Sequence, residues 1–289
     1  MESQELLRKV RRVEIKTRGL SKHLFSGEYQ SAFKGKGMSF SEVRAYQFGD
    51  DVRNIDWNVT ARSNDPFVKV FEEERELTVM LLIDISASSL FGSGEQNKRG
   101  LITELAAVLS FSAIQNNDKV GVIFFSDQVE KYIPPKKGKQ HILMIIRELL
   151  NIEPNHKGTD ISKALEYFNN VVKKRSISFL ISDFISEDFN TPLRIANKRH
   201  DMIGIHVYDK LEKELPKVGL LPVKDPESGQ MIWVDSSDAG FQRIYTESFK
   251  QKANKNKLDF QKIGASWLDM QTDESYIKTL LEFFKKRSA

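Results

Sequence analysis

The chain has 289 residues, of which 29% are charged and 40% are hydrophobic, and its formal net charge is +4. These values are typical of a globular protein that can bury a full core, as one large domain or a domain plus an appendage. The absence of cysteine excludes disulfides, thiol catalysis and cysteine-based metal centres.

The N-terminal residues are charged throughout, and the pattern predicts a helix over residues 2–18 with its apolar side chains on one stripe. This segment lacks the apolar stretch of a secretory signal, and no apolar run approaches the ~20 residues of a membrane span. We therefore expect a cytoplasmic protein without a transmembrane segment. Residues 19–76 are rich in glycine, phenylalanine and charge, and we assign residues 1–76 to an N-terminal region packed on the main domain.

From residue 77 onward, strand-like and helical patterns alternate along the chain. Strands are expected at 77–83, 119–125, 129–133, 176–181, 202–207 and 265–270, and helices at 97–116, 139–150, 160–174, 187–198, 235–262 and 274–286. This alternation predicts an α/β domain over residues 77–289, with a doubly wound, mostly parallel sheet of the von Willebrand A or Rossmann-like kind.

Two further features of this region predict local structure. Pro134 and Pro135 end a short strand, which suits an edge position. Residues 216–235 break the alternation and are predicted to form a small β-hairpin insertion that extends the last strands. Ser236 or Ser237 is a plausible cap for the long helix that follows.

The strand that ends at Ile83 is followed by Asp84, Ser86 and Ser88. A carboxylate at the end of a buried strand is costly unless something pairs with it, and hydroxyl groups alone cannot neutralise it. A divalent cation can, and hard oxygen ligands suit Mg²⁺ or Mn²⁺ rather than Zn²⁺. The alternative is a turn in which Asp84 or Ser86 caps the next helix.

Two more oxygen donors follow later in the chain. Asp183 comes directly after a buried strand, and Thr159 precedes a predicted helix. Because the carboxyl ends of neighbouring parallel strands meet at one crevice, we expect these residues to approach Asp84. Each also has a purely structural interpretation, with Thr159 or Asp160 capping its helix and Asp183 in a turn, and we expect Asp160 to be the cap.

Asp84-x-Ser86-x-Ser88, followed by Thr159 and Asp183, resembles the metal-ion-dependent adhesion site of von Willebrand factor A domains. The resemblance implies Mg²⁺ held by the three hydroxyls, with the two aspartates acting directly or through water. Mn²⁺ or Ca²⁺ would also suit these oxygen ligands. Some neighbouring residues depart from the common pattern without removing an oxygen ligand, namely Ala87, Ser89 and Phe184.

The segment from Gly35 to Trp57, with Ala61-Arg62 and the acidic run at 72–76, closely resembles the signature of the domain-of-unknown-function-58 family. These bacterial and archaeal proteins have a von Willebrand A-like domain and are commonly encoded next to an AAA+ ATPase of the MoxR type. The resemblance covers roughly residues 15–270. Many members carry N-terminal membrane helices, which we do not expect here.

The charged part of this segment, Arg44 to Trp57, has its own physical interpretation. Dense opposite charges lie between aromatic residues, and Phe48 and Trp57 suggest burial. We therefore expect a buried salt-bridge network that locks the segment against the domain. The alternative is a catalytic or partner-binding carboxylate cluster.

The function implied by the resemblance is a non-enzymatic, Mg²⁺-dependent interaction module in which an acidic residue of a partner completes the metal shell. By family analogy it would be an adaptor or chaperone-like partner of a MoxR-type ATPase acting on an unknown client. The alternative is an Mg²⁺-dependent phosphoryl-transfer enzyme or phosphatase. Ser86 disfavours it, because aspartyl-nucleophile phosphatases have a second acid there. Dispersed basic clusters disfavour a nucleic-acid partner.

Overall fold

The computed structural model describes residues 8, 10–12, 14, 38–63, 65–73, 77–94, 96–156, 158–224 and 230–288. The chain divides into two compact units, one formed by Phe33–Glu76 and the other by Met1–Ala32 with Leu77–Ala289. Most of the predicted helix over residues 2–18 lies outside the described residues, as does the turn at 225–229.

The main unit is built on a six-stranded sheet in the order β10-β7-β6-β3-β4-β5. All neighbouring strands are parallel except β4 and β5, which are antiparallel. The strands are β3 (Thr78–Asp84), β4 (Lys119–Phe125), β5 (Val129–Lys136), β6 (Ile177–Ser182), β7 (Asp201–Tyr208) and β10 (Ser266–Gln271). The predicted α/β fold class is confirmed, and the strand with the two prolines lies at the edge, as predicted.

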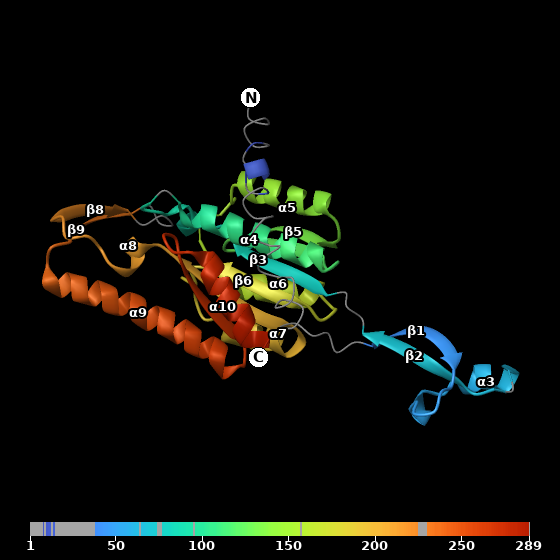
Figure 1. Ribbon diagram of the computed structural model, residues 1–289. Coiled ribbons are helices and arrows are strands. Elements are labelled where there is room, and N and C mark those ends of the chain that lie inside the picture. Colours follow the sequence, from blue (N-terminus) through green and yellow to red (C-terminus); the bar gives the residue numbers. More distant parts are fainter. Residues whose placement is uncertain are drawn as a thin grey trace. The chain divides into compact units, whose positions relative to one another are not determined.

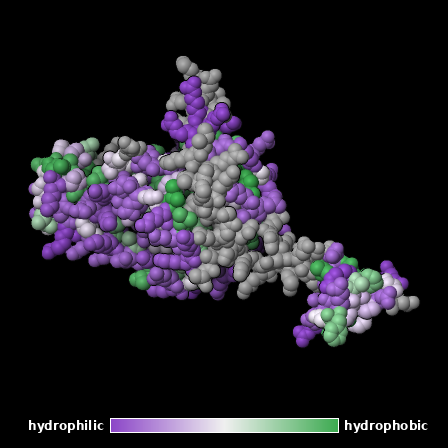
Figure 2. All heavy atoms as spheres, viewed as in Figure 1, coloured by the Kyte–Doolittle hydropathy of each residue, from purple (hydrophilic) through white to green (hydrophobic). Residues whose placement is uncertain are grey.

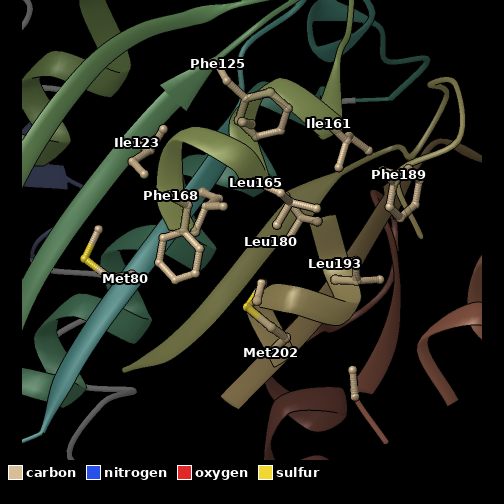
Figure 3. Close-up of a cluster of buried hydrophobic side chains, with 14 of the residues drawn as sticks. Met80, Ile123, Phe125, Ile161, Leu165, Phe168, Leu180, Phe189, Leu193 and Met202 are labelled. Atoms are coloured by element: carbon tan, nitrogen blue, oxygen red, sulfur yellow. The ribbon is translucent and has the colours of Figure 1, made fainter. Parts of the chain in front are cut away.

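Helices cover both faces of this sheet (Figure 1). The helices of this unit are α4 (Lys98–Gln115), α5 (Lys139–Asn151), α6 (Ile161–Val171), α7 (Asn190–Arg199), the short α8 (Lys210–Lys213), α9 (Ala239–Lys262) and α10 (Tyr276–Ser288). On one face, Met80 of β3 and Leu180 of β6 pack with Leu165 and Phe168 of α6 (Figure 3). Successive side chains of a strand alternate between faces, so β3 is buried on both, which explains its continuous apolar run.

The predicted hairpin is present as β8 (Leu220–Lys224) and β9 (Met231–Asp235), but it is a separate two-stranded sheet and not an extension of the last strands. Its apolar side chains are largely exposed, including Leu220, Met231 and Trp233. They gather at the left end of the space-filling view (Figure 2).

The cap of the long helix α9 differs from the prediction. Asp238 is the N-cap, and its carboxylate accepts a hydrogen bond from the Phe241 amide. The Ser236 hydroxyl instead donates to the Gly219 carbonyl at 2.7 Å and so ties the hairpin together. A carboxylate and a hydroxyl both suit an N-cap, and position along the chain alone could not choose between them.

The smaller unit contains a β-hairpin, β1 (Met38–Ala45) and β2 (Phe67–Glu73), joined through a short 3₁₀ helix (Val52–Asn54) and α3 (Trp57–Ser63). Its charges pair locally, with Arg44 donating two hydrogen bonds to Asp50 at 2.8 and 2.7 Å. Phe48 and Trp57 are exposed on this unit. The expectation that they are buried is therefore wrong within the unit, because aromatic character alone does not determine burial.

Across the described residues, no helix is both long enough and apolar enough to cross a bilayer.

A close approach between β7 and α9 depends on Gly204. A Cβ atom at this position would lie 2.7 Å from the Phe260 ring and 2.9 Å from the Trp267 ring. We expect Gly204→Ala to lower the free energy of unfolding by about 1–3 kcal/mol, as overpacking of a tight core does. Urea unfolding measures this, with Gly94→Ala as the control, because a Cβ there meets nothing within 4 Å. Equal stability of the two variants would contradict the close approach.

Candidate functional site

The parallel pairing of β3 with β6 places two acidic residues at one edge of the sheet. Asp84 ends β3, Asp183 directly follows β6, and the register pairs Ile83 with Ile181. The prediction that Asp183 approaches from the strand beside that of Asp84 is confirmed. Both residues are largely buried, with whole-residue exposed fractions of 2% for Asp84 and 9% for Asp183.

The Asp84 carboxylate is held by two donors. Its Oδ1 accepts from the Ser86 amide at 2.9 Å, and its Oδ2 accepts from the Ser182 hydroxyl at 2.6 Å. Ser86 stands at the N-cap of the 3₁₀ turn Ala87–Leu90, but its side chain makes no capping bond. The Ser86 hydroxyl lies 3.0 Å from the Ser88 hydroxyl instead. The capping alternative for Ser86 is therefore wrong, while Asp84 does hold the turn through the Ser86 amide.

The Asp183 carboxylate faces the same space. Its Oδ1 accepts from the Ile185 amide at 3.2 Å, and the Ser88 hydroxyl is a further donor to the carboxylate. Phe184, between these residues, has a φ of 56°. This left-handed backbone is costly for a bulky residue, and it turns the chain sharply after β6.

Thr159 lies in a loop at the same edge of the sheet. The Asp160 amide donates to the Ser126 carbonyl after β4 at 2.8 Å, and the Ile161 amide donates to the Ser186 hydroxyl at 3.2 Å. Asp160 caps α6 as predicted, accepting from the Lys163 amide. The structure thus joins Asp84, Ser86, Ser88 and Asp183 through hydrogen bonds. Thr159 lies in a separate loop at this edge, where its carbonyl accepts from the Ser186 hydroxyl at 3.4 Å, and ligation of a metal by these five residues stays a prediction.

Three further residues belong to the cluster but were not predicted from the sequence. They are Lys98, Glu212 and Ser182. Lys98, the first residue of α4, is only 1% exposed, and its ammonium donates to Asp183 Oδ2 at 2.8 Å and to Glu212 Oε1 at 2.7 Å. Ser182 donates to Asp84. One signal in the sequence pointed to Lys98. A cation in the first turn of a helix interacts unfavourably with the helix dipole, so a lysine there suggests a compensating contact elsewhere.

The two aspartates differ in protonation. Burial, together with the charge of Asp183, raises the pKa of Asp84 to about 7. Burial also acts to raise the pKa of Asp183, but the Lys98 ammonium outweighs it and the pKa is lowered. At neutral pH, Asp183 is therefore ionised and Asp84 is near its midpoint, a state that a nearby cation would convert to two carboxylates.

The donor set fits a hard divalent cation. Asp84, Ser86, Ser88 and Asp183 offer carboxylate and hydroxyl oxygens, which Mg²⁺ prefers, and the two hydrogen bonds to the Asp84 carboxylate come from neutral groups. Among the described residues, no group of three or more His, Asp or Glu side chains could hold a metal. A cation at Asp84 would therefore depend on the serine and threonine hydroxyls and on water.

Two spaces border the cluster. A gap of about 10 Å³ is lined by side chains that include Asp84, Ser88, Lys98 and Asp183, and this is about the size that one water molecule needs. A larger pocket of about 280 Å³ opens beside Asp183. Its walls come from the ends of β6 and β7 and from α8 and α9, and its lining includes Phe184, Tyr208, Tyr245, Phe249 and Lys252.

Comparison with known protein families shows which family the chain belongs to. Residues 42–255, well over half of the chain, match the family described as "Protein of unknown function DUF58". The chain belongs to the DUF58 family. Relatives include the uncharacterized proteins Rv1480 of Mycobacterium tuberculosis and Mb1516 of Mycobacterium bovis. Each is 28% identical to this DUF58 protein over 285 residues, covering 96% of this chain and 88% of the relative.

Two solved structures are also similar to this DUF58 chain. BatB from Bacteroides thetaiotaomicron is 17% identical with a TM-score of 0.47, covering 73% of this chain and 98% of BatB. The SpRpn10 VWA domain is 10% identical with a TM-score of 0.39, covering 72% of this chain and 95% of that domain. At these scores the fold assignment rests on the sheet topology of the DUF58 protein itself.

Proposed function

We propose that this DUF58 protein is a protein-interaction module that binds a divalent cation, Mg²⁺ first, at the cluster of Asp84, Ser86, Ser88, Thr159 and Asp183. The observation that carries the proposal is the buried Asp84 carboxyl, whose two hydrogen-bond donors, the Ser86 amide and the Ser182 hydroxyl, are both neutral. A cation held mainly by neutral hydroxyls keeps a strong attraction for anions. A carboxylate from a partner protein would complete its shell.

The surroundings support a protein as the ligand. The pocket of about 280 Å³ beside Asp183 has aromatic walls and could receive side chains that neighbour the incoming carboxylate. The hairpin β8–β9 carries exposed apolar residues, which are typical of interaction surfaces (Figure 2). Following the family analogy, we propose a MoxR-type AAA+ ATPase as the first candidate partner, with this protein acting as an adaptor toward a client.

We expect Mg²⁺ to stabilise the wild-type protein and not Asp84→Asn. A ligand that binds only the folded state adds about 2.7 kcal/mol at a concentration of about one hundred times its Kd. Thermal unfolding in Mg²⁺ and in EDTA measures the difference. Asp160→Asn is the matched control, since this aspartate lies at the same edge but caps α6, and it should keep the full Mg²⁺ response. An equal response in Asp84→Asn would contradict the proposed site.

The partner is tested by affinity capture from native lysate. Tagged wild-type protein is used in Mg²⁺ and in EDTA, with Asp84→Asn alongside, and retained proteins are identified by mass spectrometry. An AAA+ ATPase retained only by the wild type in Mg²⁺ supports the adaptor role. Identical retained sets in all three samples contradict docking through a metal, and the purified protein is then assayed for phosphatase activity.

A further inference from the structure

The most unusual side chain near the candidate metal site is that of Lys98. It ranks among the largest fully buried side chains of the protein, and lysine is almost never fully buried unless paired. Its ammonium contacts two carboxylates, Asp183 at 2.8 Å and Glu212 at 2.7 Å. The Phe91 ring centre lies 6.0 Å from the same nitrogen. Lys98 is therefore a fixed positive charge inside the cluster.

This charge borders the space that a metal would use. Lys98 lines the same gap of about 10 Å³ as Asp84, Ser88 and Asp183. The ammonium and a divalent cation would share the Asp183 carboxylate across a few ångströms of buried protein. Two cations at that range repel each other strongly, because little solvent lies between them to screen the charges.

The second partner of Lys98 is anchored independently. Glu212 belongs to a capping box at α8, in which its Oε2 accepts from the Asp209 amide at 2.7 Å. Asp209 is in turn held by the hydroxyls of Ser93 and Thr272 at 2.6 and 2.8 Å. Glu212 would therefore keep its position and its hydrogen bond to Lys98 if the contact between Lys98 and Asp183 were lost.

We infer that the Lys98 ammonium is a resident counter-ion that competes with the divalent cation for the Asp183 carboxylate, and that metal loading leaves the ammonium on Glu212 alone. Lys98 thus sets the affinity of the site for metal. This inference rests on the proposed function, because it concerns the same cluster.

The test compares Mg²⁺ affinity in the wild type, Lys98→Met and the double variant Lys98→Met with Glu212→Gln, by isothermal titration calorimetry at pH 8. We expect Kd for Mg²⁺ to fall at least tenfold in both variants. Lys163→Met is the matched control, because this exposed lysine contacts Asp160 at the same edge without touching the cluster, and its Kd should change less than twofold. The double variant keeps the net charge and leaves only one carboxylate without its ammonium partner, so it decides the outcome if the single variant does not fold.

A second measurement uses the wild type and needs no variant. The ¹⁵Nζ resonance of Lys98 should shift on addition of Mg²⁺, with the Lys163 resonance unchanged.

The outcomes separate the two proposals. An equal or weaker affinity in the folded variants, with Mg²⁺ binding in the wild type, overturns the counter-ion role and leaves the metal site standing, as does a Lys98 resonance that Mg²⁺ does not move. Binding in the wild type that becomes at least tenfold tighter in the folded variants supports the inference. If neither the wild type nor any folded variant binds Mg²⁺ or Mn²⁺, the proposed function itself fails.

Discussion

Replacing Lys98 with methionine is expected to lower the free energy of unfolding by about 3–5 kcal/mol in EDTA at pH 8. Methionine matches the apolar stem of lysine in size but removes the ammonium, which leaves Asp183 and Glu212 without their shared cation. Lys98 and Asp183 are 1% and 5% exposed at their side chains, so solvent cannot replace the lost partner. Denaturant unfolding followed by circular dichroism measures the loss.

Two variants set the scale of this loss. Adding Glu212→Gln should recover part of the stability, because one of the two carboxylates then no longer needs a cation. Lys131→Met breaks an ion pair with Glu148 that is 45% and 30% exposed, and it should cost less than about 1 kcal/mol. If Lys98→Met lowered the free energy of unfolding as little as Lys131→Met does, the buried ion pairs of Lys98 would not stabilise the fold, contrary to what their geometry indicates.

Asp84 gives the second large expected effect, which depends on pH. Its pKa is raised from 3.8 to about 7, so the folded state binds a proton that the unfolded state releases. The stability linked to that proton is fully present below about pH 4 and is lost as pH rises through 7. In EDTA, we expect the wild type to lose up to about 4 kcal/mol relative to Asp84→Asn across this window, since one pKa unit corresponds to about 1.4 kcal/mol.

The comparison with Asp84→Asn matters because another buried group acts in the opposite direction. Burial, with the charges of Arg199 and Arg175, lowers the pKa of His200 to about 4. The folded state then binds fewer protons at His200 than the unfolded state, so this contribution to stability grows between about pH 4 and 6.5. The wild-type profile alone would mix the two trends, whereas His200 is common to both proteins and cancels in the difference. A difference that stays constant from pH 5 to pH 8 would contradict the raised pKa of Asp84.

Much of the main fold could be predicted from the sequence because its signals are local. The apolar runs that became β3, β4 and β6 are uninterrupted, as strands buried on both faces require. The strand-end positions of Asp84 and Asp183 followed from the same pattern. The hairpin unit around Arg44 was not predicted as strands, because its apolar runs are short and its charges pair with one another.

The pairing of Lys98 with Glu212 could not be predicted, for a different reason. Lys98 and Glu212 are separated by 114 positions, and the local sequence around either residue does not predict a contact with the other. Ser182 was adjacent to a predicted ligand, but a strand-end serine has many ordinary roles. Contacts between distant elements depend on how strands are ordered in the sheet, and alternating patterns predict the kind of sheet without giving its order.

The spacing of the cluster along the chain also has a consequence for biosynthesis. Asp84 meets Ser182 across 98 positions, and Lys98 reaches Glu212 only after α8 has formed. During translation, the part of the domain that contains Asp84 and Lys98 leaves the ribosome before Ser182 and Glu212 have been synthesised. A truncated or stalled nascent polypeptide therefore cannot form the complete cluster. A partner that binds the cluster would bind only a domain whose synthesis and folding are complete.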